Sequence, residues 1–192
     1  MIVVALALFL QTGTVVLDNE YVRVTRNAAP CAAPNVPGCA DRVIVALGET
    51  ELVAAGVRRT MVRGDIAVFK PGEAYEPPAG GPFFEVAIKP NHPPVRSPGE
   101  ILPPEKNALR YDGERFFIFE ERLEPGETRA RHSHSQRVVV QLNRTKLRQW
   151  PDGGAEILRD IEPDGAAFNP PVIHVVKNVG QLPLRGIVIE FK

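Results

Sequence analysis

Two histidines stand two residues apart in RHSHSQRVVVQL, the segment that runs from Arg131 to Leu142. In a β-strand, residues i and i+2 point to the same face, so the side chains of His132 and His134 would project side by side. Neutral imidazole is a good ligand for Zn, Cu, Fe and Ni, which makes this pair the start of a metal site. Gln136 continues the same face if the strand stays regular, and its side chain is a candidate further ligand.

A third imidazole has to come from elsewhere in the chain, which contains four histidines. His92 lies in a proline-rich stretch, whereas His174 lies in the largely apolar segment NPPVIHVVKN. His174 is therefore the best third candidate ligand. The alternative is that the H-x-H pair stands by chance on an exposed strand end.

Three arginines, Arg129, Arg131 and Arg137, flank the histidine pair. Their positive charge disfavours the protonated imidazole, which favours metal binding at neutral pH. In a regular strand these arginines alternate with the histidines, so we expect them to face outward and to act only at long range.

The elements that must position these histidines are indicated by an internal repeat. DNEYVRVTR from Asp18 resembles DGERFFIFE from Asp112, and DRVIVALGETEL from Asp41 resembles QRVVVQLNRTKL from Gln136. The offset is 94 residues in the first pair and 95 in the second. Further on, GDIAVFKPGEAYEPPAGGPFFEVAIK parallels GAAFNPPVIHVVKNVGQLPLRGIVIEF. Two copies of one β unit therefore make up the chain.

Each copy consists of short runs rich in Val, Ile, Phe and Leu, separated by Gly, Pro, Asp or Asn. This pattern predicts an all-β sandwich or barrel. Residues 14–89 are the expected first domain and residues 106–192 the second. The stretch 90–105 contains six prolines and is the expected stiff linker. Only residues 103–110 are expected to form a helical turn.

The second copy resembles a cupin barrel. The first cupin motif is a glycine, five residues and H-x-H, which Gly126, ETRAR, His132 and His134 reproduce. The second motif is a glycine, a proline turn, a histidine and an asparagine, matched in order by Gly165, Pro170, Pro171, His174 and Asn178. The resemblance implies two jelly-roll β-barrels in tandem, with the three histidines of the second barrel facing one metal.

The resemblance breaks down at the glutamate that the cupin motif supplies as a ligand. Counting forward from His134 puts that position at Val138 or Val139, and counting back from Asn143 puts it at Gln136. Either way a neutral residue replaces a carboxylate. The metal is expected to be a divalent transition ion, Fe, Zn, Ni, Mn or Cu. The implied ligands are His132, His134 and His174, with Gln136 as a further candidate.

The first copy has lost these ligands. The repeat places Pro37, Cys39 and Asp41 at the positions of His132, His134 and Gln136, and puts Tyr75 and Glu76 near the position of His174. We expect a degenerate cupin-like barrel with a structural role. The alternative is a metal-free pocket lined by Tyr75 and Glu76.

By resemblance, the function is that of a metal-binding cupin: an enzyme acting on a small molecule by dioxygenase-, isomerase- or lyase-type chemistry. No general acid or base stands out, so the catalytic residues stay unassigned. The alternative is a non-catalytic exported module that binds a small ligand or a metal.

Residues 1–13 open with the uncharged apolar block MIVVALALFL, which predicts a signal peptide and export, although no Lys or Arg precedes it. The alternative is an N-terminal strand in a cytoplasmic protein. Cys31 and Cys39 either form a disulfide in an oxidising compartment or stay free thiols.

The expected partner is a small-molecule ligand, and a homodimer is left open. Lys plus Arg and Asp plus Glu both total 23, so no net charge attracts nucleic acid. The N-terminal apolar block is too short for a stable membrane span.

Overall fold

The computed structural model describes residues 13–28, 40–91, 93 and 107–192. Within these ranges every regular element is a β-strand, and no helix is long and apolar enough to cross a membrane. Residues 1–12 of the predicted signal peptide, most of the predicted linker and both cysteines lie outside the described residues. Residues 107–110, expected in a helical turn, instead belong to a strand that pairs with its neighbour. This pairing outweighs the weak local helical preference of NALR.

The first half of the chain forms a five-stranded and a three-stranded antiparallel sheet. The five-stranded sheet contains, in spatial order, β1 (Thr14–Asp18), β2 (Val22–Arg26), β8 (Phe83–Ile88), β3 (Asp41–Ala46) and β6 (Ile66–Phe69). The three-stranded sheet contains β5 (Val57–Met61), β4 (Thr50–Ala54) and β7 (Tyr75–Ala79).

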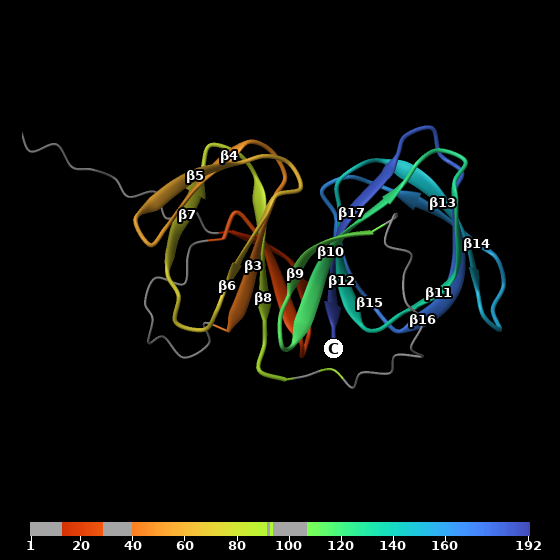
Figure 1. The fold of residues 1–192 in the computed structure, drawn as a ribbon, viewed down its shortest axis with the longest axis horizontal. Coiled ribbons are helices and arrows are strands. Elements are labelled where there is room, and N and C mark those ends of the chain that lie inside the picture. Colours follow the sequence, from red (N-terminus) through yellow and green to blue (C-terminus); the bar gives the residue numbers. More distant parts are fainter. Residues whose placement is uncertain (1–12, 29–39, 92, 94–106) are drawn as a thin grey trace, which may run out of the picture.

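The second half repeats this plan with a five-stranded and a four-stranded sheet. The five-stranded sheet contains β15 (Ala166–Asn169), β12 (Arg137–Gln141), β17 (Leu184–Phe191), β10 (Phe116–Leu123) and β9 (Asn107–Asp112). The four-stranded sheet contains β11 (Thr128–His134), β16 (Val172–Asn178), β13 (Thr145–Pro151) and β14 (Ile157–Ile161). The two halves form two barrels that lie side by side (Figure 1).

The five-stranded sheets of the two barrels pack against each other and share one core. In β12, Val138 and Val140 belong to this shared core, whereas Val139 between them faces the interior of the second barrel. In β3, Val43 belongs to the shared core and Ile44 to the interior of the first barrel. Because side chains alternate across a strand, one sheet can supply both cores, and its strands read as continuous apolar runs.

Polar contacts join the barrels at the margins of this core. The guanidinium of Arg63 donates from Nε to the carbonyl oxygen of Leu142 at 2.9 Å and from Nη2 to Asp164 at 2.6 Å. Arg115 pairs with Asp41 at 3.0 Å from the other direction. Such partly exposed pairs add little stability, so the apolar core holds the two barrels together.

The end of β16 is fixed by the side chain of Asn178, the asparagine of the second motif. Its fully buried side-chain amide donates to the carbonyl oxygens of Leu123 and Leu182, both at 2.9 Å, and its Oδ1 accepts from the Thr145 hydroxyl at 2.8 Å. Gly126, the glycine of the first motif, turns the chain into β11 with a φ of 83°. Both motif residues therefore position strands.

Replacing Ile118 by Ala tests the shared core. Ile118 is 0% exposed between the barrels, so we expect the free energy of unfolding to fall by about 2–5 kcal/mol. Ile157→Ala is the matched control, because Ile157 is 44% exposed on β14 and should change stability by less than about 0.5 kcal/mol. Urea denaturation of Ile118→Ala should show one unfolding transition, with its midpoint at a lower urea concentration than in the wild type. Two transitions, of which only the one at higher urea concentration shifts, would contradict a shared core.

Candidate metal centre

The three candidate histidines meet inside the second barrel. In the antiparallel pairing of β11 with β16, His132 stands directly opposite His174, and the centroids of their rings are 4.6 Å apart. His134 follows on the same face of β11, with ring centroids 4.9 Å from His132 and 5.6 Å from His174. Each ring offers a ligand nitrogen, and these nitrogens lie within 4.8 Å of one another. All three histidines are buried, with 1 to 5% of their surface exposed.

The hydrogen bonds of His132 and His134 leave the lone pair of each ring on Nε2. His132 Nδ1 lies 2.7 Å from the carbonyl oxygen of Ala130, which can only accept, so Nδ1 carries the proton. His134 Nδ1 lies 2.8 Å from a carboxylate oxygen of Glu190 and donates to it in the same way. His132 Nε2 and both ring nitrogens of His174 are buried without a hydrogen-bond partner. A set of unshared lone pairs in one small space is the donor set of a metal site.

Burial keeps these imidazoles neutral. Desolvation lowers the pKa of His134 and of His174 to about 2, and it also lowers the pKa of His132. Nearby ionisable groups lower the same pKa values further. Arg137 lowers the pKa of His134, and the other two histidines lower the pKa of His174. Neutral imidazole is the form that binds a metal, so no proton has to be displaced at neutral pH.

Glu190 orients His134, a role that the sequence analysis did not assign. Its carboxylate accepts from the backbone N–H of Ser135 at 2.7 Å and from the Ser135 hydroxyl at 3.2 Å. Burial raises the pKa of Glu190, and the two bonds from Ser135 oppose this rise. A carboxylate that receives the second ring nitrogen of a ligand histidine fixes the ring and makes it more basic. The available signal was a carboxylate in the apolar end of the last strand, GIVIEF.

The expectation that the flanking arginines face outward is wrong for two of the three. Arg131 is exposed and pairs with Asp152, but Arg129 is 0% exposed and Arg137 is 8% exposed. The pairing of β11 with β16 shifts register between Arg129 and His132, so one extra residue turns Arg129 to the inner face. A bend after His134 does the same for Arg137.

Gln136 lies in this bend, because β11 ends at His134. The strand therefore does not stay regular up to Gln136, which removes the geometric reason for placing it on the histidine face. Its side chain is half-buried, and its Oε1 is buried without a hydrogen-bond partner. Metal ligation by Gln136 stays a prediction.

A cavity of about 50 Å³ adjoins the histidines inside the barrel. Its polar lining includes Glu121, Arg137 and Gln141 beside His134 and His174. Glu121 accepts a hydrogen bond from Arg129 at 2.7 Å. It is a carboxylate beside the histidines, but it does not belong to the cluster of ligand atoms. The remaining walls combine the polar side chains of Gln149, Arg159 and Asn169 with apolar side chains, so the space suits a small polar molecule.

Around Tyr75, the interior of the first barrel is packed with aromatic and charged side chains. Tyr75 is 5% exposed, stacks on Phe69 with ring centroids 4.5 Å apart and donates its hydroxyl to Glu85. The guanidinium carbon of Arg42 lies 5.1 Å from the centre of the Tyr75 ring. Glu76 is exposed on the opposite face of its strand, so the two residues do not line one pocket. Pro37 and Cys39 lie outside the described residues.

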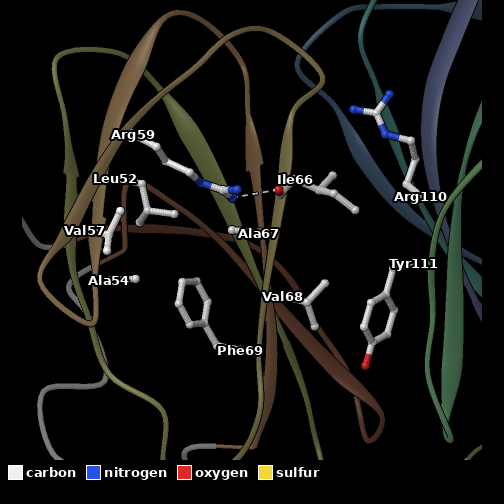
Figure 2. Close-up of a pocket in the computed structure, with 10 residues that line it drawn as sticks. All are labelled: Leu52, Ala54, Val57, Arg59, Ile66, Ala67, Val68, Phe69, Arg110 and Tyr111. Atoms are coloured by element: carbon white, nitrogen blue, oxygen red, sulfur yellow. Dashed lines mark hydrogen bonds between the residues drawn. The ribbon is translucent and has the colours of Figure 1, made fainter.

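A larger hollow of about 450 Å³ extends on both sides of β6, from the interior of the first barrel at Leu52, Ala67 and Phe69 to Arg110 and Tyr111 of β9 (Figure 2). Its walls are mainly apolar, with Arg59 and Arg110 at the margin, and Arg59 donates to the carbonyl oxygen of Ile66 at 2.9 Å. None of its lining residues in the described chain is a histidine, a cysteine or a carboxylate. It therefore lacks the donors of a metal centre.

No family model and no curated protein matches the chain. Solved structures do match. A cupin 2 conserved barrel domain protein from Leptotrichia buccalis has a TM-score of 0.57 at 12% identity, over 94% of this chain and 88% of that chain.

Two enzymes give similar values. An oxalate decarboxylase has a TM-score of 0.60 at 13% identity, over 93% of this chain and 71% of that chain. The salicylate 1,2-dioxygenase of Pseudaminobacter salicylatoxidans has a TM-score of 0.54 at 12% identity, over 88% of this chain and 70% of that chain. At such identities the likeness concerns the fold. The chain has the cupin fold, with two jelly-roll barrels in tandem and a buried three-histidine cluster in the second.

Proposed function

We propose that His132, His134 and His174 bind a divalent transition metal, and that the protein is a metal-dependent enzyme acting on a small molecule. The observation that carries the proposal is the set of imidazole nitrogens within 4.8 Å of one another, several of them buried and unpartnered. A buried polar atom without a partner costs about 1–3 kcal/mol. An ion held by these nitrogens would remove that cost.

The surroundings support the same assignment. Glu190 and the carbonyl oxygen of Ala130 orient two rings from behind, as the outer partners of metal-bound histidines do. A metal of this kind polarises a substrate oxygen, acidifies bound water or, if redox-active, supports dioxygenase-type reactions. The chain's own residues would exclude bulk water and orient the substrate against the histidines. Dioxygenase-, isomerase- and lyase-type reactions all fit such a centre.

One observation favours the alternative of a non-catalytic binding module. Both carboxylates near the histidines already have partners, Glu121 with Arg129 and Glu190 with Ser135 and His134. Neither is a free general base. Export of the protein, with residues 1–13 as signal peptide, stays a separate proposal that rests on the sequence.

Metal content and metal-dependent stability test the centre. We expect about one transition ion per chain in the purified protein, measured by mass spectrometry. Zinc added to metal-free protein at about 100 times its Kd should raise the free energy of unfolding by about 2.7 kcal/mol. His134→Ala and His174→Ala should each abolish both effects, because two imidazoles hold a metal weakly.

His92→Ala is the control for loss of a histidine and should behave as wild type. Gln136→Ala tests the fourth candidate ligand: unchanged zinc affinity would exclude it, and a clear loss would establish it. Equal zinc stabilisation in wild type and His174→Ala would contradict the proposed centre.

Turnover distinguishes the enzyme from the binding module. Protein loaded in turn with Fe, Zn, Ni, Mn and Cu is incubated with panels of thiols, diketones, sugars and small carboxylic acids. Oxygen uptake and product formation are then measured. We expect one metal to give turnover that falls at least about a hundredfold in His132→Ala. If a compound binds saturably but is not converted, whichever metal the protein is loaded with, the result would support the binding module instead.

The neutral histidines predict a pH dependence of stability in the metal-free protein. The pKa of His174 is about 2 in the folded protein and 6.5 in its ordinary state, so below pH 6.5 the unfolded chain binds a proton that the folded chain does not. Stability is therefore lost as the pH falls through this range, by up to about 1.4 kcal/mol per pH unit for each such histidine.

Urea denaturation of chelator-treated protein between pH 7 and pH 5 measures this slope. His174→Gln should lower the slope relative to wild type. The raised pKa of Glu190 acts in the opposite direction, but it is present in both proteins and cancels in the comparison. Parallel curves for the two proteins would show that His174 is not held neutral by burial.

A further inference from the structure

Arg137 presents an unused guanidinium edge beside the histidines. Its side chain is 8% exposed and lines the cavity together with His134 and His174. Nη1 donates to the carbonyl oxygens of Ser135 at 3.2 Å and Pro170 at 2.9 Å. Among the described residues, Nε and Nη2 have no hydrogen-bond partner, and no carboxylate lies within 4.0 Å of the guanidinium. The Nε and Nη2 donors of this buried guanidinium are therefore available to a ligand.

Nε and Nη2 form one edge of the guanidinium, and this chain uses that edge elsewhere to hold carboxylates. Arg23 donates from Nε at 3.0 Å and from Nη2 at 2.7 Å to the same oxygen, Oδ2, of Asp18. Arg131 reaches both oxygens of Asp152: Nε donates to Oδ1 at 3.2 Å and to Oδ2 at 3.0 Å, and Nη2 donates to Oδ2 at 2.6 Å. The two parallel donors match the two oxygens of a planar carboxylate. In Arg137, which lines the cavity, the same edge has no hydrogen-bond partner in the described chain.

The charges around the cavity are out of balance. Glu121 is paired with Arg129, and Glu190 is held by Ser135 and His134. Arg159 also lines the cavity, is exposed, and has no hydrogen bond or ion pair within the described chain. Among the residues that line the cavity, two guanidiniums, those of Arg137 and Arg159, thus stand against one carboxylate, that of Glu121, although Glu190 also offsets the charge of Arg137 from outside the lining. This excess of positive charge favours an anion there.

The other polar walls are neutral side chains that can donate hydrogen bonds. Gln141, Gln149 and Asn169 all line the cavity. The Oε1 of Gln141 is buried without a partner, so this amide is also available to a ligand. The cavity of about 50 Å³ has room for about four water molecules, which limits the anion to about two or three carbon atoms.

We propose that the cavity binds a small carboxylate anion, with the carboxylate on the free edge of Arg137, Arg159 at the entrance and the rest of the molecule against the histidines. The inference rests on the proposed metal centre and names the substrate class of that site. A carboxylate is favoured over a phosphate because the free donors lie in one plane and the space is small.

Calorimetric titration of zinc-loaded protein tests the proposal. The probes are acetate, the isosteric neutral molecule acetamide, and inorganic phosphate, and the zinc content of every variant is measured in parallel. We expect acetate to bind more tightly than acetamide and phosphate. Arg137→Gln should weaken acetate about ten- to a hundredfold and leave acetamide unchanged, because hydrogen bonds to a charged group are lost.

Two further variants make the result independent of folding. Arg159→Gln removes an exposed side chain and should weaken acetate a few-fold without a change in thermal stability. Arg148→Gln is the matched control, since the exposed Arg148 pairs with Glu156 away from the cavity and should leave acetate binding unchanged. Acetate affinity that is equal in wild type, Arg137→Gln and Arg159→Gln would overturn the proposal, as would tighter binding of phosphate than of acetate.

The outcomes separate the two proposals. Zinc retained with acetate binding independent of Arg137 overturns the carboxylate site alone. Wild-type protein that holds no zinc overturns the metal centre. In that case the titration is repeated on the metal-free protein, where loss of acetate binding in Arg137→Gln supports the carboxylate site and unchanged binding overturns it.

Discussion

In the pairing of β11 with β16, His132 stands opposite His174, and one extra residue in β11 decides what surrounds them. The antiparallel register brings two imidazoles from distant parts of the chain into contact, and the i+2 position adds His134. The extra residue turns Arg129 inward, where it holds Glu121. A bend after His134 then turns Arg137 toward the same space. One local irregularity and one bend thus give the histidines their charged surroundings.

This arrangement needs a rigid support, because neutral imidazoles with unpartnered nitrogens are costly to bury. The shared core between the barrels supplies it. Val138 and Val140 lie in that core while Arg137 and Gln141, on the other face of β12, line the cavity. The first barrel has no such cluster in its described part and contributes the opposite half of the core. A purely structural role for the first barrel stays a prediction.

The sequence allowed the two-barrel fold and the histidine cluster to be predicted, because both depend on regular patterns. Strand alternation pairs His132 with His134, and His174 was the best of the remaining histidines and matched the second cupin motif. The arginines were misjudged because a bulge and a bend break the alternation on which the prediction relied.

Other features depend on pairing between distant strands. Glu190 reaches Ser135 across 55 residues, and no local signal marks that contact. The strand at Asn107–Asp112 looked helical locally and is fixed by its pairing with β10. A charged residue inside an apolar strand, such as Glu190 or Arg137, is the signal that was available.

X-ray absorption spectroscopy of the zinc-loaded protein tests the central claim most directly, because it counts the imidazole ligands around the ion. We expect three imidazole nitrogens at about 2.0–2.1 Å from the zinc and the loss of one of them in His174→Gln. A zinc environment with one imidazole or none, or one that is unchanged in His174→Gln, would contradict it.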